Sequence, residues 1–177
     1  MGVTIHYELV VASSDAAFAV LEAARAFAAE QEWDVESVDI EDGEKTYMFD
    51  EVEEPYRGPL WGVVLRPHQD CESLAIVFGA NGVAQDYCKT QFAPVEVHVS
   101  AINLLKQLAK HCESLSVRDE GEYLSSGDRE HLAQRLTEHA DAIQEICAQE
   151  HCQLKYRSSS GRIWDGYGEQ GVVEVKL

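Results

Sequence analysis

Hydrophobic and polar positions near the start of the chain predict a strand, a helix and a second strand. Residues 3–11 are rich in β-branched and aromatic side chains, which is typical of a strand. Ser13, Ser14 and Asp15 can cap a helix that is predicted over about 15–32. Its buried stripe is expected from the apolar residues at helical spacing, which are Ala17, Val20, Leu21, Ala24, Phe27 and Ala28. Residues 35–40 alternate in polarity and predict a short strand.

Further along, the same patterns predict hairpin strands and two more helices. The strands are expected at 61–66, 73–78, 83–90, 114–119 and 122–124, with 172–177 as a candidate edge strand. Asn81-Gly82 supplies the positive φ angles of a hairpin turn, and Glu120-Gly121 is interpreted as a second hairpin. Helices are predicted from Pro94 to about 111 and from Asp128 to about 149. Residues 95–99 also alternate like a strand, but the apolar spacing from Ile102 onward favours the helix.

The order of these elements predicts an α+β fold. Hairpin strands that do not alternate strictly with helices indicate a mostly antiparallel sheet with about three helices packed on it, beginning β-α-β. The length of 177 residues suits a single globular domain, 1–177. Residues 41–60 carry many acids together with Gly43, Pro55, Gly58 and Pro59. We therefore expect an irregular acidic loop there, with at most a short strand at 46–49.

Charge narrows the choice of partners. The net charge is −18, and the segment from Glu30 to Glu54 holds twelve carboxylates against Lys45 alone. Such a field repels nucleic-acid phosphate and anionic membranes, so neither is an expected partner, whereas a basic protein surface would be attracted. Simple solubility is the alternative explanation. A basic and aromatic patch around Lys155, Arg157 and Arg162 is expected to meet the acidic segment, within the chain or across a homodimer.

The expected compartment is a bacterial cytoplasm. No apolar run approaches the length of a bilayer span, and residues 1–6 lack the basic region and apolar core of a signal peptide. The five cysteines are odd in number and irregularly spaced, so free thiols are expected in place of a disulfide framework.

The link between two predicted strands, residues 66–72, offers the first candidate chemistry. It holds Arg66, His68 and Cys71 among carboxylates. A cysteine nucleophile needs a nearby base or cation to ionise, and His68 and Arg66 are placed to serve Cys71. His68 and Cys71 are therefore the candidate catalytic residues and Arg66 a candidate ligand-binding residue. A polar turn made rigid by Pro67 is the favoured alternative.

Two other polar clusters are candidate ligand-binding sites. Lys89, Thr90 and Gln91 precede a predicted helix, where backbone amides and these side chains could hold an anion. Asp119 and Glu120 are clustered carboxylates of the kind that bind hard cations. The alternatives are turn and capping roles for both clusters.

Thiols and imidazoles recur as neighbours along the chain. They are found at His111-Cys112 and at His151-Cys152. The close-spaced ligand pairs of structural zinc sites are missing, so neither a metal nor a cofactor is expected.

Residues 89–98 and 119–128 also carry a resemblance. The sequence KTQFAPVEVH, followed by DEGEY and Gly127-Asp128, is similar to a family of uncharacterised bacterial proteins. Where that family tends to have Trp-Glu-Thr before the Gly-Asp, this chain has Leu124, Ser125 and Ser126. The likeness spans about the central third of the chain and implies no activity. It implies that 89–98 and 119–128 border one cleft.

These observations favour a small non-enzymatic binding or protein-interaction protein with an acidic surface. The focused acidity and the missing catalytic motif lead to that hypothesis. The alternative is a small-molecule-binding or hydrolytic enzyme that uses the His68/Cys71 turn.

Overall fold

The computed structural model describes residues 2–49, 51–150, 153–157, 162–168 and 171–172, with side chains described up to 148 and at 162 and 163. The chain starts β1 (Thr4–Val10), α1 (Ser14–Glu30) and β2 (Asp34–Phe49), which confirms the predicted β-α-β start. Ser13 caps α1, because its hydroxyl accepts the Ala16 N–H at 3.2 Å. All six residues of the predicted helical stripe are buried.

The remaining elements follow the predicted mixture of hairpins and helices. They are β3 (Val52–Arg66), β4 (Leu74–Gly79), β5 (Val83–Lys89), α2 (Val95–Leu108), a 3-10 turn (Ala109–His111), β6 (Ser114–Asp119), α3 (Tyr123–Ser126), α4 (Arg129–Glu150), β7 (Gln153–Arg157), β8 (Ile163–Gly168) and β9 (Gly171–Val172). The ambiguous stretch after Pro94 is helical, as the spacing from Ile102 indicates. Of the candidate edge strand at 172–177, Val172 belongs to β9, and 173–177 lie outside the described residues.

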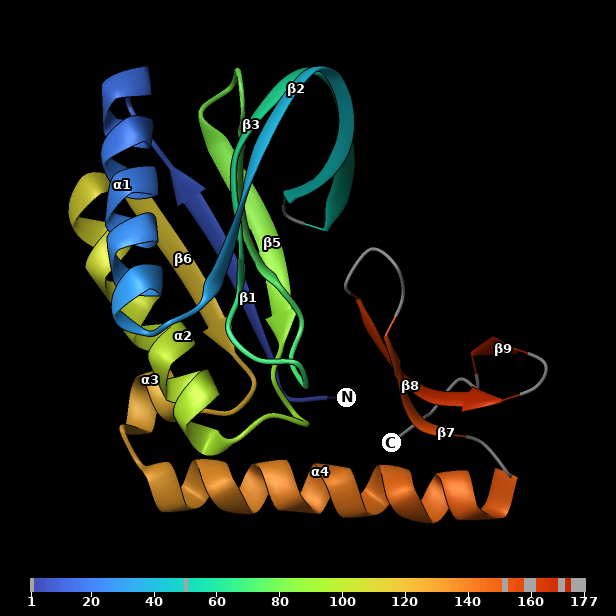
Figure 1. The fold of residues 1–177 in the computed structure, drawn as a ribbon. Helices are drawn as coiled ribbons and strands as arrows, with labels where there is room; N and C mark the ends of the chain where they lie inside the picture. Colours follow the sequence, from blue (N-terminus) through green and yellow to red (C-terminus); the bar gives the residue numbers. More distant parts are fainter. Residues whose placement is uncertain (1, 50, 151–152, 158–161, 169–170, 173–177) are drawn as a thin grey trace.

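Every described strand pairing is antiparallel, so the predicted α+β class is confirmed. The strand orders are β5-β1-β6, β2-β3-β4 and β7-β8-β9, and a tight turn at Gly79–Gly82 joins β4 to β5. Helices α1 and α2 cover one side of β5-β1-β6, and the β2–β3 hairpin curls on the other side (Figure 1). None of the helices in the described residues is long and apolar enough to cross a membrane.

The main core lies between these helices and the strands. It contains the inward residues of β1, β3 and β4, among them Leu9, Val63 and Ile76, packed against α1 and α2. A smaller cluster joins Val3 and Val99 to Leu132 of α4. Burial of these side chains contributes most of the folding free energy, since apolar area removed from water stabilises by roughly 25 cal/mol per Å².

The expected acidic loop at 41–60 is wrong. Most of this segment lies in β2 and β3, which pair over nearly their whole length with an irregularity between Ile40 and Gly43. The hairpin tolerates acids because most of its side chains face solvent. Arg57 compensates two of them, bonding Asp42 at 3.0 and 2.7 Å and lying 3.7 Å from Glu44.

The predicted second hairpin, with a strand at 122–124, is also wrong. Residues 123–126 form the helical turn α3 instead. Asp119 explains the change, because its carboxylate accepts the backbone N–H groups of Gly121 at 2.7 Å and Leu124 at 2.8 Å. Glu122 takes a left-handed conformation with φ of 60°, which turns the chain away from β6.

Candidate functional site

Cys71 and His68 lie in the link between β3 and β4, where the thiol contacts the backbone of His68. Cys71 is 1% exposed, and its Sγ lies 3.5 Å from the backbone carbonyl of His68. The His68 ring instead accepts the N–H of Asp70 at Nδ1, at 3.0 Å. A hydrogen bond with Cys71, together with burial, raises the pKa of the neighbouring Cys88 well above its usual range. This environment favours the protonated thiol of Cys88 over a nucleophilic thiolate.

Arg66 lies at the end of β3, and its guanidinium bonds Glu36 across the hairpin. Both side chains are about half exposed. Arg66 therefore connects two strands, and the structure places its charge in an ion pair with β2.

Thr90, His98 and Asp119 form a buried polar chain between β5, α2 and β6. The Thr90 hydroxyl lies 2.7 Å from His98 Nδ1 and donates to the carbonyl of Val3 at 3.2 Å. His98 Nε2 lies 3.0 Å from Asp119 Oδ1, an ion-pair distance without the alignment of a straight hydrogen bond. All three side chains are essentially inaccessible. Segments 89–98 and 119–128 thus come together as expected, but around a packed interior.

Gln91 and Glu120 also bind the chain itself. The Gln91 Oε1 accepts the N–H of Val3 at 3.1 Å, and a Glu120 oxygen accepts the N–H of Thr4 at 3.2 Å. Burial alone would raise the pKa of Asp119 and of Glu120, yet contacts with His98 and His6 respectively lower both below the usual range. Thr90, Gln91 and Glu120 therefore bond the start of β1, whereas Asp119 bonds the turn that follows β6.

Lys89 belongs to a different cluster, which attaches β8 to the body of the molecule. Its Nζ donates to the carbonyl of Ile163 at 3.2 Å, while Glu72 accepts the Ile163 N–H at 2.8 Å. Arg162 bonds Asp86 at 2.6 Å and lies 3.5 Å from Glu72. The described part of the expected basic patch thus pairs with acids outside the 30–54 segment. The side chains of Lys155 and Arg157 lie outside the described residues.

No cluster of three or more potential metal ligands occurs among the described residues. The carboxylates of Asp119 and Glu120 are each engaged by backbone N–H groups and an imidazole.

A groove of about 1180 Å³ lies under the β2–β3 hairpin. Its floor comes from β1, β5 and β6, and its wall from β2 with Leu60 of β3 and Val77 of β4. The β2–β3 hairpin, whose strand β2 lines the groove, lies on the side of β5-β1-β6 opposite α1 and α2 (Figure 1). Strand β2 is the outer strand of β2-β3-β4, so the wall of the groove is a sheet edge.

The lining of this groove contains both apolar and charged side chains. Ile40, Met48 and Tyr87 are large hydrophobic side chains that remain substantially exposed within it. The cations of the lining are Lys45, Arg118 and Arg162, and its acids are Glu8, Glu44 and Asp86. Exposed apolar side chains among balanced charges are typical of a binding surface.

Gln85 holds the hairpin above the floor. Its Oε1 accepts the backbone N–H of Met48 at 2.6 Å, and its Nε2 donates to the Met48 carbonyl at 2.7 Å. The same Nε2 donates to Glu8 at 2.7 Å. The side-chain amide of Gln85 thus occupies the position that a neighbouring peptide unit would take beside β2.

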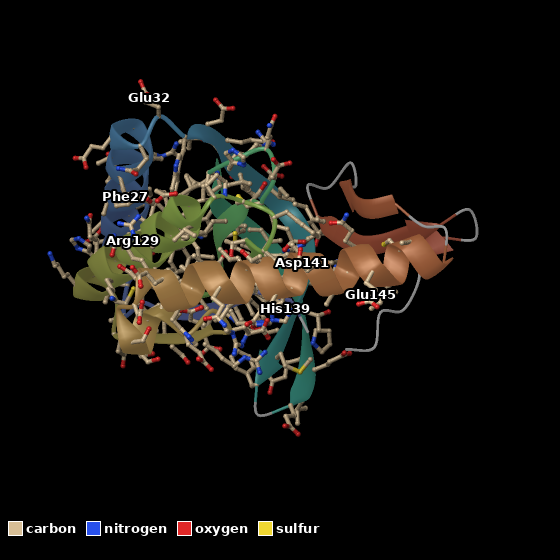
Figure 2. All side chains as sticks on the ribbon, turned by 90° about the horizontal axis from the view of Figure 1, so that it is seen from below. Phe27, Glu32, Arg129, His139, Asp141 and Glu145 are labelled. Carbon is tan, nitrogen blue, oxygen red and sulfur yellow. The ribbon has the colours of Figure 1, made fainter. Side chains whose placement is uncertain are left out.

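A second hollow, of about 780 Å³, lies on the helical side, between α1, α2 and the start of α4. Figure 2 shows two of its lining residues, Phe27 on α1 and Arg129 at the start of α4. Arg129 is already paired with Glu96 at 3.0 Å. This hollow is mostly polar and offers less apolar surface than the groove.

The sequence did not point to the groove, because the wall-forming segment was interpreted as a loop. The available signal was the pattern in residues 44–49, where Lys45 and Tyr47 alternate with exposed residues. Comparisons of the chain with protein-family models, with curated proteins and with solved structures find no match.

Proposed function

We propose that this protein is a non-enzymatic binding protein that holds an extended segment of a basic partner protein in the groove under the β2–β3 hairpin. The observation that carries the proposal is the groove itself. It is larger than a typical small-ligand pocket of roughly 300–1,000 Å³, and its open form suits a chain segment.

The chemistry of the lining favours binding over catalysis. His6 is the imidazole in the groove, and its Nε2 lies 3.0 Å from Arg118 and 3.3 Å from Glu120. Among the groove residues that the structure describes, Ser116 is the one serine and there is no cysteine, and no described hydrogen bond joins Ser116 to a base. The alternative enzyme at the His68/Cys71 turn has less support, because Cys71 is buried.

The negative charge of the protein favours a basic partner. Of the acids on the hairpin, Glu36, Asp42 and Glu44 are in described ion pairs. Glu41 on β2 and Glu53 on β3 are exposed acids that add to the negative field around the groove. A net charge of −18 steers basic chains toward the molecule and repels a second copy of it. We therefore favour a different, basic protein over a homodimer.

A matched pair of substitutions tests the proposal. Ile40 lines the groove and is 47% exposed, whereas Val52 lies outside it at the hairpin end and is 59% exposed. The probe is a peptide of alternating lysine and valine or threonine residues, and binding is measured by calorimetry. Ile40→Lys places a like charge in the groove and is expected to weaken binding at least about tenfold. Val52→Lys adds the same charge elsewhere and is expected to change affinity less than about threefold.

Either of two results would overturn the proposal. One is that the peptide does not bind the wild-type protein. The other is that both lysine variants weaken binding equally, which would reduce the effect to overall charge.

A further inference from the structure

We infer that the partner segment binds by adding a strand to the free edge of β2, pairing with the backbone of Thr46 and Glu44. This inference deepens the proposed function and rests on it, because it specifies how the same groove would hold its occupant. Strand addition uses main-chain hydrogen bonds for affinity and alternate side chains for specificity.

The direction of the backbone groups of Met48 is the first observation. Both its N–H and its C=O are taken by the side chain of Gln85, so both point away from β3. Backbone groups of an antiparallel strand alternate between its two edges. Those of Thr46 and Glu44, two and four residues earlier, therefore also point away from β3.

Pro55 supports the same assignment independently. It lies opposite Thr46 in the β2–β3 register, and proline has no N–H to donate. A proline fits a pair whose members do not bond each other, and is unfavourable in a bonded pair. Pro55 therefore cannot donate a hydrogen bond to the Thr46 carbonyl. The backbone N–H and C=O of Thr46 face the outer edge of β2 instead.

This outer edge borders the groove. Glu44, Thr46 and Met48 all line it, and no other described residue hydrogen-bonds the backbone of Thr46 or Glu44 from that side. Gln85 occupies the edge at Met48, so an incoming strand has its free pairing positions at Thr46 and Glu44. An unpaired edge beside exposed hydrophobic side chains is a template for another strand.

The neighbouring side chains indicate what the added strand carries. Cross-strand neighbours on one face of a sheet interact directly, with opposite charges favourable. A lysine or arginine suits the position beside Glu44, and a β-branched residue suits the one beside Thr46. The segment is thus expected to alternate basic and β-branched residues.

Amide hydrogen exchange tests this mode of binding on the wild-type protein with the lysine-rich peptide. Bound peptide is expected to slow exchange at the Thr46 N–H at least about tenfold, because that group gains a hydrogen bond. The N–H groups of Lys45 and Tyr47, which face β3, are expected to change little. Peptide that binds without slowing Thr46 more than Lys45 would overturn strand addition and leave groove binding standing. Peptide that does not bind would overturn the proposed function as well.

Two variants at one position give a matched second test. Thr46→Pro removes only the N–H that faces the groove, at an edge position where proline is tolerated. It is expected to weaken peptide binding at least about tenfold. Thr46→Val keeps the N–H and is expected to bind within about twofold of wild type. Equal binding by both variants would contradict the inference. If Thr46→Pro does not fold, the exchange measurement on the wild-type protein still tests whether the peptide adds a strand to β2.

Discussion

The buried Asp119 is expected to stabilise the fold strongly, and Asp119→Asn tests this. The carboxylate is 2% exposed, accepts two backbone N–H groups and faces His98 Nε2 at 3.0 Å. Asparagine keeps the size, but its amide nitrogen can only donate, so one N–H group loses its acceptor. A buried donor left without a partner costs about 1–3 kcal/mol, and the loss of charge opposite His98 adds to this.

The expected loss of unfolding free energy is about 2–3 kcal/mol at pH 7, which corresponds to a Tm decrease of roughly 4–12 °C for a chain of this size. Chemical denaturation and calorimetry measure both quantities. Asp128→Asn is the matched control, because Asp128 is exposed and caps α4 by accepting N–H groups at 2.9 and 3.0 Å. Asparagine caps as well as aspartate, so the control is expected to lie within about 0.5 kcal/mol of wild type.

The stability lost in Asp119→Asn should also decrease as the pH falls. The pKa of Asp119 is lower in the folded protein than its usual value, so its ionised form stabilises the fold above the unfolded pKa of about 3.9. That contribution to stability is lost as pH falls through the folded pKa of Asp119. The asparagine side chain does not ionise, so the variant lacks this contribution at every pH. The gap between wild type and Asp119→Asn should therefore narrow below about pH 4. A gap under about 0.5 kcal/mol at pH 7, or one that does not narrow in acid, would refute the reasoning.

Two other predictions concern the attachment of β8 and the thiols. Glu72→Leu removes the side-chain oxygen that accepts the Ile163 N–H, so amide exchange at Ile163 should accelerate at least about tenfold; an unchanged rate would show that this bond does not hold β8. Cys71 and Cys88 are buried, whereas Cys112 is only partly buried, so mass spectrometry should find iodoacetamide on Cys112 before Cys71 or Cys88 in the native protein. Fastest alkylation at Cys71 would contradict this order and support the enzyme alternative.

Much of the secondary structure could be predicted because it depends on local periodicity. The helical stripe that includes Val20 and Ala24 is fully buried in α1, and Asn81-Gly82 turns β4 into β5. The long hairpin could not be predicted from local signals, since glycines, prolines and acids normally indicate a loop. Pro55 is compatible with a strand only because it sits where no hydrogen bond to Thr46 is needed, and that depends on the register.

The candidate site could not be predicted for a similar reason, because its contacts join residues that are far apart in the sequence. Thr90, Gln91 and Glu120 were predicted to bind a ligand, and in the structure they bond the backbone of Val3 and Thr4, far away in the sequence. Buried N–H groups require acceptors, and a sequence does not show which distant polar side chain will supply them. Polar clusters were therefore interpreted as ligand sites when they complete the interior.

The central claim, that the groove binds an extended basic segment, is tested most directly by an NMR titration of the protein with the lysine-rich peptide. The account predicts saturable shifts around Ile40, Met48 and Tyr87, which border the groove. Shifts that cluster instead around Phe27 and Arg129 on the helical side (Figure 2), or no saturable shift anywhere, would contradict it.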